Sequence, residues 1–193
     1  MRRFMTVLVA VAGGSLLTGL ACAQETNGCV LLPATKLEAF DTNTDTVIIK
    51  ATAPIGTVQA HGGEVSVRCR EITDAGTGRR ESGIVVDIAL GGPAEAGLLI
   101  DYDELDSLLD GIEYLGKLDW SVTPLPDFQA TYTTKGGFRV DAHGSRRTGN
   151  IEFDVRNQRL YAPKLVLSRD QLGQLRSLVE QAKAKLDSLR KAK

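Results

Sequence analysis

Apolar and polar residues alternate along several short runs of the chain, which is the pattern of β-strands with one buried face. Between residues 64 and 71, for example, the apolar positions are Val65, Val67 and Cys69. Turn sequences rich in glycine, such as His61-Gly62-Gly63, separate the runs. The pattern predicts eight strands, at residues 46–51, 56–60, 64–71, 82–90, 128–134, 137–143, 149–156 and 159–167.

Two segments with a helical apolar period align with each other without gaps. Residues 98–115 match residues 165–182, and in each segment a short apolar strand end runs directly into the helix. The aligned apolar pairs are Leu105 with Leu172, Leu108 with Leu175, and Ile112 with Val179. The alignment predicts an internal repeat in which each unit ends with a strand followed by a helix.

Both helices begin with the pattern of a capping box. In this motif a cap side chain accepts a hydrogen bond from the first turn, and a residue three positions on reaches back to the cap. Asp101 with Glu104 and Ser168 with Gln171 have the required spacing. The sequence therefore predicts that each pair caps its own helix, with a stabilisation of about 1 kcal/mol per cap.

The combined pattern predicts an α+β fold of two diverged ββββα units. Each unit is an antiparallel four-stranded sheet followed by a helix, and together they form one compact domain. A single sheet covered by one helix would have a thin core, so we expect the sheets to face one another or to pack on the helices. The predicted segments are a signal peptide (1–23), an N-terminal segment (24–44), the first unit (45–116), a linker (117–127) and the second unit (128–193).

The last helix carries apolar residues at alternating spacings of three and four, which is the seam of a coiled coil. The favoured interpretation is that this seam docks on the protein's own sheet, because it spans fewer heptads than a coiled coil needs. A homodimer through the C-terminal helix is the alternative. The seam residues are Leu172, Leu175, Val179, Ala182, Leu186 and Leu189.

The first 23 residues have the order of a bacterial secretory signal peptide, with Arg2 and Arg3 followed by an uncharged and largely apolar run. Cleavage is expected between Ala23 and Gln24, which makes the protein periplasmic or secreted. Lipidation at Cys22 is an alternative that would anchor the protein to a membrane. A retained membrane-spanning anchor is a further alternative.

Two cysteines remain after such a cleavage, Cys29 and Cys69. In an oxidising compartment they predict a disulfide that closes a loop of about 40 residues. Two buried thiols that never meet are the equal alternative.

Charge and composition narrow the range of partners. With Arg2 and Arg3 removed, 21 Lys and Arg stand against 24 Asp and Glu, so the mature net charge is about −3. The order of the elements resembles, in topology, the Whirly and Pur-type folds, which bind single-stranded nucleic acid on sheet faces. Here the outward positions of the last strands, such as Glu152, Asp154 and Arg156, mix both signs and lack exposed aromatics. We therefore expect no nucleic-acid partner.

The stretch Asp141 to Arg146 has the residue types of a hydrolase site, with Asp141 to orient His143 and Ser145 to attack. Residues two apart on a strand lie about 6–7 Å apart, so Asp141 can reach His143. No nucleophile-elbow sequence accompanies them, and nothing fixes Ser145 next to the base. The favoured interpretation is a strand end with a surface histidine, and a hydrolase is the alternative.

Two metal sites are also conceivable from the sequence. His61 and His143 could share a transition metal with Asp141 or Glu64 if the two turns met. The run from Asp41 to Thr46 begins like a calcium loop, with oxygen-bearing side chains at alternate positions. Thr46 and Thr52 stand where such a loop requires glycine and glutamate, however, which favours a polar turn. No cofactor is expected.

The sequence thus predicts an exported binding or assembly module without catalytic activity, acting on an envelope protein or a small ligand. A hydrolase centred on Asp141 and His143 and a calcium-stabilised protein remain as alternatives. The expected binding faces are the polar sheet positions Arg139, Asp141 and His143 in the second unit, and Arg68 and Arg70 in the first.

Overall fold

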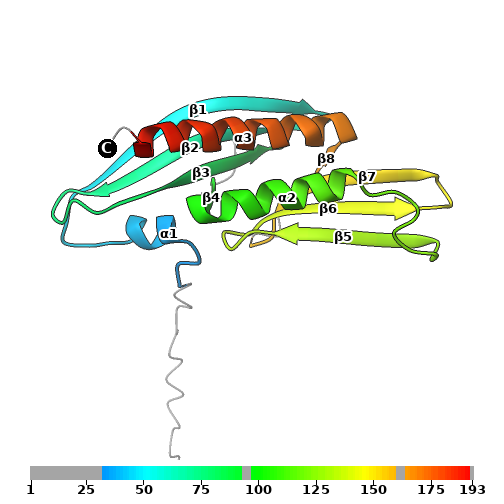
Figure 1. Cartoon of the computed structure of the whole chain (residues 1–193), viewed down its shortest axis with the longest axis horizontal. Coiled ribbons are helices and arrows are strands. Elements are labelled where there is room, and N and C mark those ends of the chain that lie inside the picture. The colour runs from blue at the N-terminus through cyan, green and yellow to red at the C-terminus, as the bar shows by residue number, and fades with distance from the viewer. Residues whose placement is uncertain (1–31, 93–96, 160–163, 192–193) are drawn as a thin grey trace, which may run out of the picture. The chain divides into compact units, whose positions relative to one another are not determined.

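The computed structural model describes residues 32–92, 97–159 and 164–191. These residues form two four-stranded antiparallel sheets, each followed by a helix (Figure 1). Sheet A has the strand order β1-β2-β3-β4, and sheet B has the order β5-β6-β7-β8. The predicted α+β fold of two ββββα units is therefore confirmed.

Each unit places its strands in sequence order, so that every strand pairs with the next one along the chain. The strands of sheet A are β1 (Ile48–Ala60), β2 (Gly63–Asp74), β3 (Arg80–Ala89) and β4 (Leu98–Asp101). Those of sheet B are β5 (Asp127–Thr133), β6 (Phe138–Ser145), β7 (Asn150–Asn157) and β8 (Leu165–Leu167). The helices are α1 (Lys36–Asp41), the short 3₁₀ helix η1 (Tyr102–Glu104), α2 (Leu105–Gly116) and α3 (Arg169–Lys191).

The division of sheet A into strands differs from the prediction. The predicted strands 46–51 and 56–60 are one strand, β1, whose register with β2 shifts between Pro54 and Gly56. A proline lacks the N–H that a central strand needs, but β1 is an edge strand, where a bulge tolerates it. The run predicted as the fourth strand of this unit, residues 82–90, is the third strand, β3. The fourth strand in the structure is the short β4.

The two helices are exchanged between the units. Helix α3, which follows sheet B, lies along β1, β2 and β3 of sheet A, while α2, which follows sheet A, packs on β5 and β6 of sheet B (Figure 1). The helices also contact each other, and α3 reaches β7 and β8. Each unit thus covers its sheet with the helix of the other, and the two units share one hydrophobic core.

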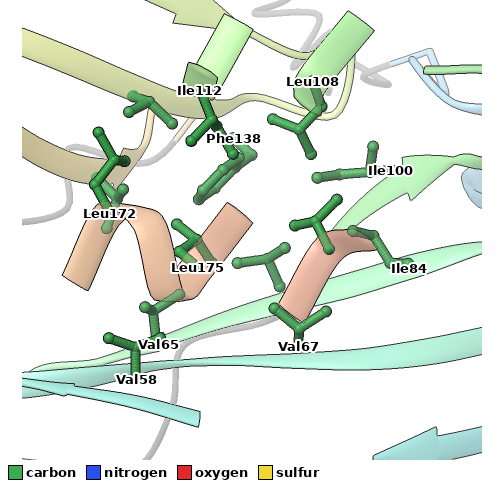
Figure 2. Packing of buried hydrophobic residues seen from close by; sticks show 14 of the residues in the cluster. Val58, Val65, Val67, Ile84, Ile100, Leu108, Ile112, Phe138, Leu172 and Leu175 are labelled. Atoms are coloured by element: carbon green, nitrogen blue, oxygen red, sulfur yellow. The ribbon is translucent and has the colours of Figure 1, made fainter. Parts of the chain in front are cut away.

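The centre of this core lies around α3. Figure 2 shows Leu172 and Leu175 of α3 between two groups of apolar residues. On one side are valines of sheet A, such as Val65, and on the other are Ile112 of α2 and Phe138 of β6. All five side chains are almost completely buried. The α3 seam is buried from Leu172 to Leu186, whereas Leu189 is 44% exposed. The favoured prediction, that the seam docks on the protein's own sheet, is therefore confirmed. A homodimer through this helix would have to use its exposed side.

One of the two predicted capping boxes is confirmed and the other is wrong. The backbone N–H of Ser168 donates to Gln171 Oε1 at 2.7 Å, and the N–H of Gln171 donates to Ser168 Oγ at 3.2 Å. The Asp101 carboxylate instead accepts from the backbone N–H groups of Lys36 at 2.7 Å and Leu37 at 3.1 Å. Helix α1 packs beside β4, so Asp101 caps this distant helix, and η1 precedes α2 in its place.

The aligned residues Glu104 and Gln171 make equivalent contacts across the two units. Glu104 Oε1 accepts from the backbone N–H of Lys135 in the β5–β6 turn at 2.9 Å. Gln171 Nε2 donates to the carbonyl of Gln59 at the end of β1 at 2.7 Å. The β5–β6 turn presents an N–H donor, so a carboxylate suits position 104. The end of β1 presents a carbonyl acceptor, so the amide of Gln171 suits the equivalent position.

The segment between Gly116 and Asp127 has no regular helix or strand and is held by Arg146. The Arg146 guanidinium donates to the carbonyls of Trp120 at 2.7 Å and Thr123 at 3.0 Å, and lies 5.5 Å from the centre of the Trp120 ring. These contacts fix the connection between the two units beside the β6–β7 turn.

Because α3 covers sheet A from within the shared core, Leu175→Ala should lower the free energy of unfolding by about 3 kcal/mol, through lost burial and a residual cavity. Leu189→Ala, on the same helix but largely exposed, should change it by less than about 0.5 kcal/mol. Urea unfolding followed by circular dichroism measures both values. Equal effects of the two substitutions would contradict the docking of this seam.

Candidate functional site

The outer face of sheet B carries a cluster of charged side chains. Alternation along β6 buries Phe138, Val140 and Ala142 in the core, and so places Arg139, Asp141 and His143 on the opposite face. Across the β6–β7 register, Arg139 faces Arg156, Asp141 faces Asp154, and His143 faces Glu152. We call the group Arg139, Asp141, His143, Asp154, Arg156 and Lys164 the sheet B network.

Asp141 is the centre of this network and is 0% exposed. Its carboxylate accepts from Arg139 Nε at 2.7 Å and Nη2 at 2.8 Å, and from Arg156 Nη2 at 2.8 Å. Gln129 Nε2 at 3.1 Å and the Thr131 hydroxyl also donate to it. Burial alone would raise the pKa of the Asp141 carboxyl, but the hydrogen bonds from Arg139, Thr131 and Gln129 outweigh it and hold the pKa well below its usual range.

Asp141 lies on the predicted outer face of β6, but it is buried there and not exposed. We expected Arg139, Asp141 and His143 to line a solvent-exposed surface together. Arg139 and His143 do reach solvent, but Asp141 lies beneath the two guanidiniums and is closed off. A partner arriving from solvent meets the arginines first.

Asp154 is the second buried carboxylate, with 1% exposure. Its Oδ2 accepts from Lys164 Nζ at 3.2 Å and lies 3.0 Å from His143 Nε2. Its Oδ1 is buried and has no hydrogen-bond partner among the described residues. Like charges directly opposite on neighbouring strands repel, so the surrounding cations are what allows Asp141 and Asp154 to face each other.

One metal-like arrangement occurs in the described part of the chain. A nitrogen of His143 and oxygens of Asp141 and Asp154 lie within 4.8 Å of one another. Both Asp141 oxygens already accept from arginine, however, and Lys164 contacts Asp154, so an added cation would face three fixed positive charges. The donor set fits an ion network better than a metal site.

The predicted pairing of the two histidines for a metal does not form in the described residues. His61 is exposed in the β1–β2 turn and belongs to no such group, and Glu64 accepts instead from the Gln59 side chain. His143 has Asp154 as its carboxylate partner.

The hydrolase geometry is also not assembled in the described residues. His143 Nε2 pairs with Asp154, whereas the Asp141 oxygens are saturated by hydrogen bonds. Ser145 lies at the end of β6, opposite Asn150, and its hydroxyl makes no hydrogen bond to His143. A nucleophile needs a base within about 3 Å, and Asp141 with its low pKa is a poor proton acceptor.

The predicted face of sheet A forms a separate arrangement. Arg68 binds Asp87 in two parallel bonds, Nε to Oδ2 and Nη2 to Oδ1, both 2.8 Å long. Arg70 Nε is buried without a hydrogen-bond partner in the described part of the chain. Farther along this face, Leu37 and Phe40 of α1 cover Ile72. The two predicted faces thus lie on different sheets and do not combine into one site.

In the loop that resembled a calcium site, the side chains of Asp41 and Thr46 have partners within the chain. Asp41 is the last residue of α1 and pairs with Lys50. The Thr46 hydroxyl donates to Asp74 at 2.6 Å, and this bond, with those from Thr77, lowers the pKa of Asp74 to about 2. These contacts make residues 41–46 a polar turn that enters β1.

A cleft of about 500 Å³ lies between the far end of sheet A, the start of α2 and the end of α3. The Arg190 guanidinium lies 4.0 Å from the centre of the Tyr102 ring, and the Tyr102 hydroxyl bonds to Asp187. Charges of both signs line it, and two ion pairs, Lys36 with Asp103 and Arg80 with Glu71, lie within the lining. The lining residues are Lys36, Glu71, Arg80, Glu81, Ser82, Tyr102, Asp103, Asp106 and Arg190. Nothing in its lining selects a ligand of one charge.

Cys69 is buried on β2 and has no disulfide partner among the described residues, and its Sγ lies 3.5 Å from the carbonyl of Ala182. Burial raises the pKa of this thiol. Cys29 lies outside the described residues, and so do the predicted signal peptide, its cleavage site at Ala23 and Gln24, and Cys22. The disulfide and the processing therefore stay predictions.

Sequence reasoning did not identify the partners that make the network. Gln129 and Thr131 on β5 and Lys164 before β8 were not singled out, and Asp154 and Arg156 were noted only as outward positions. The signal was present in the register, since a hairpin that pairs Ser145 with Asn150 places Asp154 opposite Asp141.

No protein-family model, curated protein or solved structure matches the chain. Among the described residues, no helix has the length and apolar character needed to cross a membrane.

Asp141→Asn should lower the free energy of unfolding at neutral pH by about 3–5 kcal/mol, because it leaves two arginines without their buried carboxylate. The folded pKa of Asp141 lies below the unfolded value of about 3.9, so this stabilisation is present above that value and is lost as the pH falls below it. The difference between wild type and Asp141→Asn in urea unfolding should therefore be largest above about pH 5 and shrink below about pH 4.

Glu152→Gln is the matched control, because Glu152 lies on the same face of β7 and is exposed. It should change stability by less than about 0.5 kcal/mol at neutral pH. A wild-type advantage over Asp141→Asn that is independent of pH would contradict the ionised, arginine-bound state of Asp141.

Proposed function

We propose that this protein is an exported bacterial binding or assembly module that acts without covalent chemistry, and that its contact surface is the outer face of sheet B. The sheet B network carries the proposal. Asp141 and Asp154 are buried beneath side chains that have positive charge and reach solvent, so the face presents hydrogen-bond donors held on a rigid sheet.

The observation with the most weight is the surplus of donors on the two arginines. Arg139 uses Nε and Nη2, and Arg156 uses Nη2. Within the described part of the chain, Arg139 Nη1 and Arg156 Nε and Nη1 have no hydrogen-bond partner. Their guanidiniums are fixed from below by Asp141, and these remaining donors are free for a partner.

The proposal of a role without catalysis is supported by the state of Asp141, the carboxylate of the candidate hydrolase site. Proton transfer needs a group that gains and loses a proton near the working pH, and Asp141 stays ionised because its pKa is far below that range. A binding role asks only that donors and charges keep their positions, which the paired residues do.

Export rests on the sequence of the first 23 residues, with a charged start, an apolar stretch and small residues before the expected cleavage site. In this proposal the mature protein begins at Gln24. Lipid attachment at Cys22 is the alternative form, and it would hold the same binding face at a membrane surface.

The intact mass of the protein purified from its native envelope tests the export. We expect the mass of a chain that starts at Gln24, because the signal peptide is removed. Comparison before and after reduction reports whether two hydrogens have been lost to a disulfide between Cys29 and Cys69. Full-length protein that retains Met1 would contradict export by cleavage, and a mass increase of a lipid on Cys22 would replace the soluble form with the anchored one.

Charge reversal at the network tests the binding face. Tagged mature protein, cross-linked in its own envelope, should retain a reproducible partner that Arg156→Glu loses, because Arg156 supplies free donors at the surface. Quantitative mass spectrometry of the cross-linked products measures the loss, and thermal unfolding verifies that the variant is folded.

Arg147→Glu is the matched control, an identical change on an exposed arginine in the β6–β7 turn. Arg147→Glu should still capture the partner as wild type does. If folded Arg156→Glu captures as much partner as wild type, the sheet B face is not the contact surface. If Arg156→Glu and Arg147→Glu lose the partner equally, the loss follows from net charge and not from this face.

A further inference from the structure

We infer that the paired arginines Arg139 and Arg156 form a binding site for a tetrahedral oxyanion, a phosphate group above all. The inference rests on the proposed function, because it names the ligand chemistry of that face. The site consists of the unbonded nitrogens of two guanidiniums that already share one carboxylate, Asp141.

The two guanidiniums are close enough to act on one small anion. Both donate to the same oxygen, Asp141 Oδ2, from Arg139 Nε at 2.7 Å and Arg156 Nη2 at 2.8 Å. On the buried side their anion is Asp141. The donors without a partner among the described residues are Arg139 Nη1 and Arg156 Nε and Nη1, on side chains that are 21% and 34% exposed, so up to three nitrogens can serve an incoming oxyanion.

The local charge favours an anion. Arg139, Arg156 and Lys164 stand against the carboxylates of Asp141 and Asp154, so the fixed charges of the network, three positive and two negative, leave one positive charge in excess. A carboxylate on this face outside the network, that of Glu152, lies four residues from Arg156 along β7. At about 3.3 Å per residue this is roughly 13 Å, beyond the screening length of about 8 Å at physiological salt. The arginine end of the face is therefore positive where a ligand would bind.

Donor number selects the class of anion. Each guanidinium presents planar N–H groups that match phosphate or carboxylate oxygens. Donors from two guanidiniums suit a group whose oxygens spread in several directions, as those of phosphate do, better than the two coplanar oxygens of a carboxylate. Free phosphate and the headgroup of an anionic phospholipid both supply this chemistry.

The test follows the Nε–H signals of Arg139 and Arg156 by nitrogen-15 NMR of the mature protein during titration with sodium phosphate at constant ionic strength. The signal of Arg156 should move and saturate, and acetate should bind more weakly. A parallel arm uses vesicles of phosphatidylglycerol and phosphatidylcholine, with sedimentation as the readout. Saturation by phosphate identifies free phosphate as a sufficient ligand, and binding to vesicles alone identifies the headgroup as the source.

Arg156→Gln should weaken phosphate binding by about ten-fold or more, the usual effect of removing a charged hydrogen-bond donor. Arg147→Gln, in the exposed turn, should leave it unchanged. Arg156→Lys keeps the positive charge above Asp141 but removes the planar donors, so it should fold normally and still bind more weakly.

Three results would overturn the inference. These are arginine signals that respond to neither phosphate nor vesicles, acetate binding as tight as phosphate, and an unchanged phosphate affinity in Arg156→Gln or Arg156→Lys. Failure here is distinct from failure of the proposed function. A partner lost from Arg156→Glu in the cross-linking experiment, together with silence toward phosphate, would keep the binding face and discard its oxyanion chemistry.

Discussion

The burial of the α3 seam on sheet A is the contact on which the rest of the structure depends. Helix α3 follows sheet B along the chain but covers the inner face of sheet A, and α2 makes the reverse crossing to β5 and β6. The apolar face of each sheet is therefore covered by the helix that belongs to the other unit. This exchange fixes the two sheets through one core and leaves their outer faces free for polar residues.

The sheet B network is a different kind of structure from this core, since it buries charge where the core buries hydrocarbon. Replacing a whole buried ion network by apolar residues of the same size is often neutral for stability, although removing one partner alone is costly. The network with Asp141 and Asp154 is therefore not explained by a net gain in stability. What they provide is position. Asp141 holds two arginine side chains against a strand at defined distances, and freely rotating arginines would lose far more side-chain entropy on binding a ligand.

Local pattern predicted most of the architecture, and distant contacts decided what it missed. Alternation located β2, β3, β5, β6 and β7, and the Ser168 cap formed as expected because both of its residues lie in one turn. The prediction for Asp101 was wrong because helix α1 brings its own N–H groups to β4 from far away in the sequence. The depth of Asp141 was missed for the same reason, since β7 supplies Arg156 and β5 supplies Gln129. The strands predicted at residues 46–51 and 56–60 are continuous as β1, because this edge strand absorbs Pro54 at a shift in register.

The outer face of sheet A shows how few cations a buried aspartate needs. There Asp87 has one guanidinium, that of Arg68, which donates two parallel bonds, and the Ser66 hydroxyl donates to it at 3.4 Å. Asp141 already has the same two-bond fork from Arg139, and yet Arg156 adds a second guanidinium to it. The two sites also differ in their cross-strand neighbour, because Asp87 lies opposite Ser66 whereas Asp141 lies opposite the buried Asp154. The second guanidinium offsets the repulsion between the two carboxylates and at the same time brings nitrogens without a partner among the described residues to this face, which is the property that a binding surface uses.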